Sequence, residues 1–316
     1  MIEIKNINKV FLNKVKQDGK KVKKEVISVN NLNLKIEKGE IVGFVGPNGA
    51  GKSTTIKMIT GILHPTSGSI SVDGLNPIKD RKKLAYKIGC MFGQKSQLWM
   101  HLPSIDTYNL LGTIYDVEKN KLNKRIDELT TLFNIQDIIN IPVRKLSLGQ
   151  RMICEIVAIM LHEPEIIFLD EPTIGLDIVV KQKLRDVILK LNKEKNVTVF
   201  LTSHDIGDVE SICERIIIID KGNIIKDEKI CTLKREYFSN KILNITYESD
   251  VSKVKFDMPV SVNGNSIMAN INDNVDISEM LNNFLQYGKI LDFTMESIPL
   301  EDIIYDIYAS EESDLE

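Results

Sequence analysis

The sequence is poor in the features that mark secreted, zinc-binding and membrane-spanning proteins. It has four cysteines and four histidines among 316 residues, and the cysteines form neither a C-x-x-C pair nor a cluster with histidine. This spacing argues against a zinc site and favours reduced, mostly buried thiols. No apolar run approaches the ~20 residues of a membrane-spanning helix, and the opening "MIEIKNINKV" lacks the apolar core of a signal peptide. We therefore expect a cytoplasmic protein that reaches a membrane only through partners.

The sequence also lacks a strong charge of either sign. Its formal net charge is −3 and its isoelectric point is about 5.9, so nothing attracts the chain as a whole to nucleic acid. Hydrophobic residues make up 43% of the chain, as in a soluble globular protein. A chain of this length forms one large domain, or one large and one small domain. We expect no nucleic-acid partner.

A glycine-rich loop lies between a buried strand and a helix in "EIVGFVGPNGAGKSTTIKMITGIL". The segment from Gly46 to Ser53 fits G-x-x-x-x-G-K-[ST], whose glycines let backbone N–H groups surround phosphates. Lys52 adds a positive charge near the β- and γ-phosphates, and Ser53 offers a hydroxyl to Mg²⁺. The residues expected to hold the nucleotide are Gly46, Pro47, Asn48, Gly49, Ala50, Gly51, Lys52, Ser53 and Thr54.

Two adjacent carboxylates end the buried strand predicted in "EIIFLDE". Adjacent residues of a strand point to opposite faces, so the two acids are expected to take different roles. Asp170 would hold the Mg²⁺ shell, and Glu171 would polarise an attacking water. The alternative is a pair of solvated acids that cap the strand.

A histidine, His204, follows the next buried strand in "VTVFLTSHD". The end of a core strand is where a parallel sheet builds its ligand crevice, so we expect His204 to contact the γ-phosphate. A structural histidine is the alternative.

A second phosphate-binding edge is predicted in "LSLGQRM", about a hundred residues after the glycine loop. Ser147 and Gly149 precede an apolar run and indicate a helix start. Free backbone N–H groups and the helix dipole make such a start an anion site. One chain would then carry two such sites.

Together these motifs resemble the ATP-binding subunit of an ABC transporter over about the first 230 residues. They occur in the family's order: Gly46–Thr54 like Walker A, Gln94 in "FGQKSQLW" like the Q-loop glutamine, Leu146–Gln150 like the signature, Asp170-Glu171 like Walker B, Gly175-Leu176-Asp177 like the D-loop, and His204 like the switch histidine. The resemblance implies an α/β P-loop core with an antiparallel β subdomain and a helical subdomain. It also implies that Gln94 contacts Mg²⁺ and acts in catalysis with Glu171, His204 and Lys52.

In this family two nucleotide domains pair head to tail, so that the signature of one closes on the ATP held by the other. The resemblance therefore implies a second copy, or a homologous ATPase subunit, as partner, with Ser147, Gly149, Gln150 and Asp177 near the partner's nucleotide. Leu148 stands where the family usually has a second glycine. The resemblance also suggests that Phe11 stacks on adenine, although Phe11 could instead be a core residue.

The composition shifts toward Asn, Ser and Asp after about residue 236. We expect an ATP-binding domain over residues 1–235, with a helical subdomain at about 95–160, and a small α+β accessory domain over 236–316. In the latter, "KILNITYE", "SIMANIN" and "ILDFTME" alternate like half-buried strands, and "DISEMLNNFLQYG" indicates a short helix.

A single nucleotide domain implies, by the same resemblance, integral membrane permease subunits that hold the protein on the inner face of the membrane. An apolar group after Gln94 suits docking of their helices, although it could instead be subdomain core: Leu98, Trp99, Met100 and Leu102. The wording "GQKSQLWMHLP" and "DEPTIGLD" is similar to ATPases of drug-resistance and viologen-type exporters. An importer ATPase and a soluble ABC ATPase acting on ribosomes or DNA remain the alternatives.

Overall fold

The computed structural model describes residues 1–316 except 18–19, 94–95, 238–239, 273–276, 298 and 314–316. The chain divides into two compact units, Met1–Glu228 and Lys229–Glu316. The predicted boundary after residue 235 falls within helix α8 (Ile230–Tyr237), at the start of the second unit, and stays a prediction. In the described part of the chain, no helix combines the length and the hydrophobicity that crossing a membrane requires.

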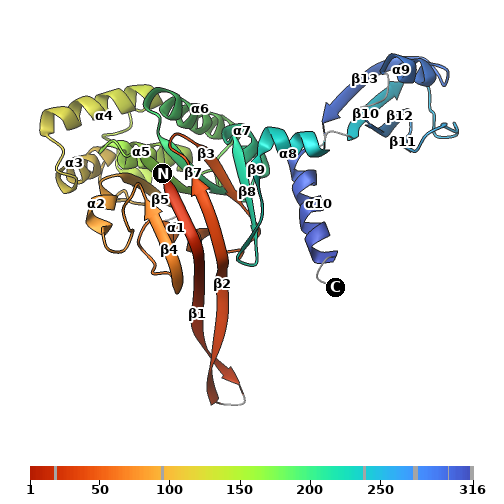
Figure 1. The fold of residues 1–316 in the computed structure, drawn as a ribbon. Coiled ribbons are helices and arrows are strands. Elements are labelled where there is room, and N and C mark those ends of the chain that lie inside the picture. Colours follow the sequence, from red (N-terminus) through yellow and green to blue (C-terminus); the bar gives the residue numbers. More distant parts are fainter. Residues whose placement is uncertain (18–19, 94–95, 238–239, 273–276, 298, 314–316) are drawn as a thin grey trace. The chain divides into compact units, whose positions relative to one another are not determined.

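The first unit is built on a six-stranded sheet of order β5-β6-β7-β3-β8-β9 (Figure 1). Its strands are β3 (Ile41–Val45), β5 (Ile88–Phe92), β6 (Ile166–Asp170), β7 (Thr198–Ser203), β8 (Arg215–Asp220) and β9 (Asn223–Lys229). Strands β5, β6, β7, β3 and β8 pair in parallel. Strands β3, β6 and β7 are buried along their whole length, which explains why they appear in the sequence as continuous apolar runs.

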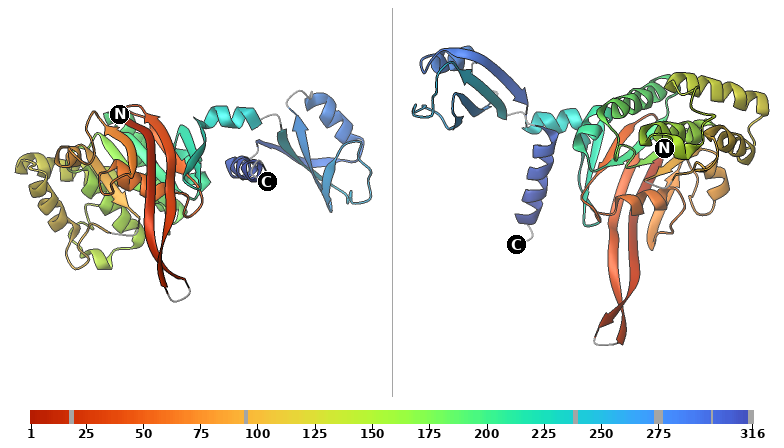
Figure 2. Two further views of the ribbon diagram at one scale, coloured as in Figure 1. Left: turned by 60° about the horizontal axis from the view of Figure 1, so that its bottom comes forward. Right: turned by 180° about the vertical axis from the view of Figure 1, so that it is seen from behind.

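A three-stranded antiparallel sheet, of order β2-β1-β4, adds a second layer to this unit. Its strands are β1 (Ile2–Gln17), β2 (Lys20–Ile36) and β4 (Ser67–Val72). Strand β4 pairs only with the first part of β1, and β1 and β2 continue beyond it as a two-stranded ribbon (Figure 2). This is the antiparallel β subdomain that the family resemblance implied.

The helices of the first unit begin with α1 (Lys52–Ile59), directly after the glycine loop. The others are α2 (Arg81–Ala85), α3 (Ser104–Ile114), α4 (Lys119–Phe133), the 3₁₀ turn η1 (Val143–Lys145), α5 (Leu148–Met160), α6 (Ile178–Lys195) and α7 (Ile206–Ile212). Helices α3 and α4 lie at the end of the unit opposite β8 and β9 (Figures 1 and 2). Helices α3, α4 and α5 fall in the segment for which a helical subdomain was predicted.

The register of the sheet brings the ends of three strands together. Phe44 of β3 pairs with Thr202 of β7, and Thr202 also pairs with Asp170 of β6. Since these strands are parallel, the loops that follow them leave from one edge of the sheet. That edge therefore collects the glycine loop, the two carboxylates and the histidine.

The second unit has its own core under a four-stranded antiparallel sheet of order β11-β12-β10-β13. Its elements are α8, β10 (Asn240–Tyr247), β11 (Val260–Asn263), β12 (Ser266–Asn272), α9 (Ile277–Leu285), β13 (Ile290–Ser297) and α10 (Leu300–Ser313). Met280 and Phe284 of α9 belong to the same buried cluster as Leu243 and Ile245 of β10. The predicted α+β class is thus confirmed for this unit.

Candidate functional site

The glycine loop wraps the start of α1 and lines a cavity of about 370 Å³. Gly51 caps the helix with φ of 109°, a conformation that L side chains rarely adopt. A Cβ at Gly51 would also lie 2.5 Å from the Ser28 carbonyl oxygen, so only glycine fits. The cavity is lined by Ser28, Pro47, Asn48, Gly49, Gly51, Lys52, Ser53, Thr54, Glu171, Ile174 and His204.

Lys52 is held by the loop that precedes it. Its side chain is 7% exposed, and its ammonium donates to the carbonyl oxygens of Gly46 (2.5 Å) and Pro47 (3.2 Å). Burial lowers the pKa of Lys52, and the negative charges of Glu171 and Asp170 partly oppose that effect. The nearest of these carboxylates, on Glu171, lies 3.9 Å from the ammonium. A phosphate in the cavity would give this buried charge the strong partner that it lacks.

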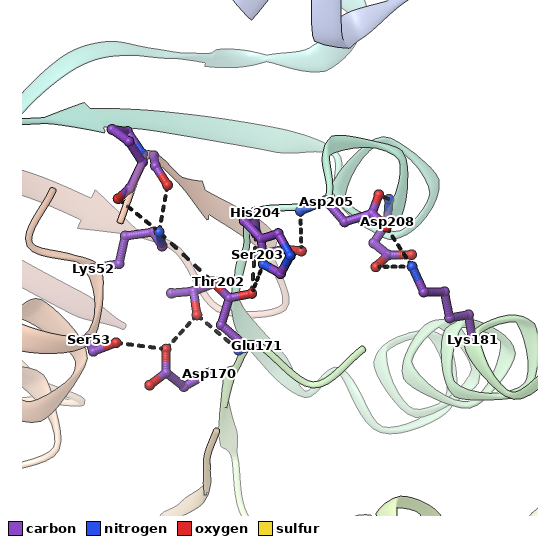
Figure 3. A network of polar contacts seen from close by, with 12 residues as sticks. Lys52, Ser53, Asp170, Glu171, Lys181, Thr202, Ser203, His204, Asp205 and Asp208 are labelled. Carbon is purple, nitrogen blue, oxygen red and sulfur yellow. Dashed lines mark hydrogen bonds and ion pairs between the residues drawn. The ribbon is translucent and has the colours of Figure 1, made fainter. Parts of the chain in front are cut away.

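Ser53 and Asp170, both predicted to hold Mg²⁺, lie within hydrogen-bonding distance of each other. The Ser53 hydroxyl donates to Asp170 Oδ1 at 3.2 Å, and the buried Thr202 hydroxyl donates to the same oxygen at 2.7 Å (Figure 3). A hydroxyl and a carboxylate are hard oxygen ligands of the kind that Mg²⁺ prefers, with waters and phosphate oxygens completing its octahedron. The residues present therefore fit a magnesium ion.

Glu171 departs from the strand geometry that the sequence predicted. Strand β6 ends at Asp170, and Glu171 has a φ of 56°, a left-handed backbone that costs about 1–2 kcal/mol. Its N–H donates to the carbonyl (3.1 Å) and the hydroxyl (3.2 Å) of Thr202, which hold the turn in place. The sequence predicted that the pleat of one strand would point the two acids to opposite faces. That reason was wrong, because Glu171 lies in a turn after the strand and the turn sets its direction.

His204 lies against Glu171 at the end of β7. Its Nδ1 is 2.6 Å from Glu171 Oε2, and its backbone N–H donates to the same oxygen at 3.3 Å (Figure 3). A carboxylate only accepts, so Nδ1 carries the proton in this contact. The imidazole is 58% exposed while the carboxylate is 15% exposed. The pair places a proton acceptor inside the cavity and a proton donor at its mouth.

Ser147 begins α5 in a reciprocal capping box. Its hydroxyl accepts from the Gln150 N–H at 3.2 Å, and its own N–H donates to the Gln150 side chain at 2.9 Å. Gly149 is required for packing, because a Cβ there would lie 2.7 Å from Val180 Cγ2 of α6. Leu148 is 47% exposed. The helix start predicted from "LSLGQRM" is confirmed, and its anion-binding role stays a prediction.

The signature residues are absent from the described lining of the chain's own nucleotide cavity. Leu148 instead lines a second cavity of about 370 Å³, whose lining it shares with Met91, Gly93, Ser96, Arg151, Met152, Glu155, Glu171, Ile174 and Gly175. Asp177 caps α6, where its carboxylate accepts from the Val180 N–H at 2.9 Å. Among the described residues, only Glu171 and Ile174 line both cavities.

For two predicted residues the described geometry gives no support. Phe11 lies in β1 opposite Val26, with the Lys9 ammonium 5.0 Å from its ring centroid, and it is outside the described lining of the nucleotide cavity. Its stacking on adenine stays a prediction. Gln94 lies outside the described residues.

Two polar residues that the sequence did not single out support the site. The Thr202 hydroxyl connects the Asp170 carboxylate to the backbone N–H of Glu171, and its only sequence signal is its place in the strand two residues before His204. Glu155 of α5 is buried, and it accepts from the Ser96 hydroxyl and from the Gln97 N–H at 3.0 Å. Burial raises the pKa of Glu155, and these hydrogen bonds oppose that effect. It thereby ties the chain after β5 to the signature helix.

The fold and the cavity define a P-loop nucleotide-binding domain. A parallel sheet of order β5-β6-β7-β3-β8 carries a glycine loop, a lysine and a helix N-terminus at the edge where Asp170 and Glu171 also lie.

Comparison with known proteins identifies the family. The family model "ABC transporter" matches residues 29–174. The chain is 36% identical over 209 residues to the ABC transporter ATP-binding protein NatA of Bacillus subtilis, covering 66% of this chain and 83% of NatA. It is 34% identical to the bacitracin transport ATP-binding protein BcrA of Bacillus licheniformis, covering 66% and 67%. The chain therefore belongs to the ATP-binding proteins of ABC transporters, and it is an ATPase.

The chain is also similar to an import ATP-binding protein and to a solved dimeric cassette. The chain is 30% identical over 275 residues to the methionine import ATP-binding protein MetN 1 of Listeria monocytogenes, covering 82% of this chain and 74% of that protein. A solved ATP-binding cassette, dimeric and in a post-hydrolysis state with ADP and Pi, has a TM-score of 0.63 and 28% identity, covering 73% of this chain and 99% of that one.

Proposed function

We propose that this chain is the motor subunit of an ABC exporter, and that two copies bind two MgATP head to tail and drive separate permease subunits. The observation that carries the proposal is that one chain has a glycine loop at its nucleotide cavity and a second, exposed helix start outside the described lining of that cavity. The glycine loop lines one cavity, whereas Leu148, in the first turn of α5, lines a second one, and Ser147 belongs to the described lining of neither. An anion site that does not serve its own chain's nucleotide has a use in a symmetric pair, where each copy completes the other's site.

Within each site, the described side chains divide the work of phosphoryl transfer to water. The loop N–H groups and Lys52 would hold the β- and γ-phosphates, and Ser53 and Asp170 would hold Mg²⁺, whose charge would offset that of the phosphates. Glu171 accepts the proton of the attacking water. His204, whose Nδ1 contacts Glu171, lines the same cavity and contacts the γ-phosphate there. Because this phosphate lies in the interface, its release removes the contact that holds the pair closed.

Removing the Ser147 hydroxyl tests the trans site. Ser147→Ala should lower steady-state ATP turnover by about 10²-fold, as for loss of a single transition-state donor. The affinity of one chain for mononucleotide should stay unchanged, because Ser147 lies outside that cavity. Turnover by coupled assay and binding by calorimetry measure the two quantities.

The substitution also removes a helix cap, which needs its own control. Glu118 caps α4 by accepting from the N–H groups of Asn120 and Lys121, away from both cavities. Glu118→Ala should therefore lose a cap at comparable cost without affecting turnover. Equal turnover of Ser147→Ala and the unmodified chain would remove Ser147 from the mechanism.

The apolar group after residue 95 supports docking of a membrane partner. Trp99, Met100 and Leu102 are 53%, 36% and 37% exposed, whereas Leu98 is 3% exposed and belongs to the core. Three neighbouring apolar side chains left in water are suited to cover by a partner helix. For Leu98, the burial agrees with the alternative interpretation of this group, that it belongs to the subdomain core.

Trp99 allows a direct measurement, because it is the only tryptophan in the chain. Vesicles that contain the permease should shift its emission to shorter wavelength, since docking moves the indole from water to an apolar surface. Vesicles without permease and a Trp99→Phe chain are the controls. An unchanged spectrum with bound permease would place docking elsewhere.

The direction of transport rests on similarity. The likeness to BcrA, and to drug-resistance ATPases in "DEPTIGLD", favours export, whereas the likeness to MetN 1 makes an importer the second candidate. Deleting an exporter ATPase should increase sensitivity to toxic compounds, including viologen-like cations. Deleting an importer ATPase should instead create a nutrient requirement. Stimulation of ATP hydrolysis by RNA or DNA, with none by permease vesicles, would support a soluble non-transport role.

A further inference from the structure

The first turn of α6 touches three functional segments at once. Asp177 of the D-loop caps this helix, accepting from the Val180 N–H at 2.9 Å. Val180 packs against Gly149 so closely that a Cβ on the glycine would lie 2.7 Å from Val180 Cγ2. The next residue, Lys181, reaches the chain that follows the switch histidine (Figure 3).

Lys181 makes two ion pairs across to α7. Its ammonium lies 2.5 Å from Asp205 Oδ2 and 3.1 Å from Asp208 Oδ2. Asp205 directly follows His204, and its other oxygen accepts from the Asp208 N–H at 3.3 Å as the N-cap of α7. The Asp205 N–H in turn donates to the Ser203 hydroxyl at 3.0 Å. The turn that carries His204 is therefore fastened at its far side to Lys181.

This connection joins elements that face different nucleotides under the proposed function. Ser147 and Asp177 would meet the partner's ATP, whereas His204 lines the chain's own cavity with Glu171. Only one helical turn, from Asp177 to Lys181, separates the two groups of contacts. A displacement of that turn by the partner would move Lys181 and, through Asp205, the histidine.

We propose that Lys181 is a positioning residue that couples contact with the partner subunit to the placement of His204 in the chain's own site. This proposal rests on the proposed function, because it requires the closed pair. Lys181 touches neither nucleotide, and it acts by holding the turn after His204 in register with the first turn of α6. The geometry also explains why a lysine suits the position, since its long side chain carries the ammonium from α6 to both carboxylates, on Asp205 and Asp208.

The alternative is that the ion pairs only pin α7 to α6. Partly exposed pairs of this kind contribute little to stability, and the side chains of Lys181 and Asp205 are 28% and 39% exposed. A structural pin would affect unfolding and leave the response to ATP unchanged. A coupling residue would change kcat and the ATP-driven pairing while leaving the melting temperature nearly unchanged. These readouts separate the two roles.

The test compares three variants of the full chain. Lys181→Met removes the charge and keeps the aliphatic stem, Lys181→Arg restores the charge, and Lys190→Met removes a charge from an exposed pair with Glu194 on the same helix. We expect Lys181→Met to lower kcat by about 10-fold, the scale of mutations along a coupling network. Its KM for ATP should change less than about twofold, since the phosphate-binding groups are untouched. Lys181→Arg should recover most of the rate, and Lys190→Met should behave like the unmodified chain.

The outcomes are distinguishable from failure of the proposed function. If the unmodified chain neither pairs with MgATP nor hydrolyses it, alone or with permease, the proposed function fails and takes this inference with it. If the unmodified chain is active and Lys181→Met has the same kcat and the same cooperativity in ATP, the coupling role is overturned. A lower melting temperature with unchanged kcat would likewise assign Lys181 a structural role only.

Discussion

Replacing Glu171 with glutamine should lower the rate of ATP hydrolysis by about 10³-fold, the range expected for loss of a general base. The amide keeps the size of the side chain and can still accept from the His204 backbone N–H, which now lies 3.3 Å from the carboxylate. It cannot take a proton from water at neutral pH. Nucleotide binding should persist, because the loop, Lys52 and the Ser53–Asp170 pair are unaltered.

The same variant should accumulate as a closed pair in MgATP, since pairing no longer ends in hydrolysis. Size-exclusion chromatography with light scattering measures this, and the ADP-bound variant serves as the unpaired reference. Glu165→Gln is the matched control. It neutralises a carboxylate just before the other end of β6, where Glu165 pairs with Lys38 and Lys87. Normal hydrolysis by Glu171→Gln would assign the base to another group.

Substitution of Lys52 with methionine should raise the dissociation constant of MgATP by about 10²-fold. The ammonium would make at least one charge-assisted hydrogen bond to phosphate, and such bonds contribute about 1.5–3 kcal/mol. Methionine keeps the buried stem and removes the charge whose pKa burial lowers. The nucleotide-free protein should therefore unfold at nearly the same temperature, because it loses a charge that burial disfavours.

Lys57, an exposed lysine near the end of the same helix, provides the control. Lys57→Met should bind MgATP like the unmodified chain. Calorimetric titration gives both dissociation constants. Equal affinities of the Lys52 and Lys57 variants would mean that the loop N–H groups alone hold the phosphates, and would contradict the role given to Lys52.

The phosphate-binding loop could be predicted from sequence because its geometry is local. Gly51 needs its left-handed backbone to begin α1, and the residues that follow it are already in the helix. The end of a buried strand is similarly visible as an apolar run that stops at Asp170. In both cases the chemistry depends on residues a few positions apart, so spacing alone carries the information.

Contacts between distant segments could not be predicted in this way. Thr202 meets Asp170 because β6 and β7 are in parallel register, and Lys181 meets Asp205 because α6 and α7 contact each other. Nothing in the spacing of these residues indicates either pairing. The left-handed turn at Glu171 was missed for the same reason, since it is held by hydrogen bonds that the Glu171 N–H donates to Thr202 of the neighbouring strand.

The second unit shows the same limit at the level of topology. Alternating residues correctly indicated β10, β12 and β13, and the segment "DISEMLNNFLQYG" indicated α9. The short strand β11 was missed, and the order β11-β12-β10-β13 does not follow the sequence. Pairing order depends on which strands meet across the chain, and the alternating pattern of each strand alone does not contain that information.

Leu148 would make closure of the dimer depend on temperature if its face closes on another subunit. Its side chain is 47% exposed and lies over the D-loop glycine, where a Cβ at Gly175 would be 3.0 Å from Leu148 Cδ2. A glycine at this position would bring only backbone to the interface, whereas this chain would bury part of a leucine side chain at each of the two sites. Full burial of a leucine side chain stabilises an interface by about 1.5–3 kcal/mol. Burial of apolar surface carries a negative heat-capacity change, so closure would weaken on cooling. The leucine would make the closing step of this motor more sensitive to temperature than a glycine would.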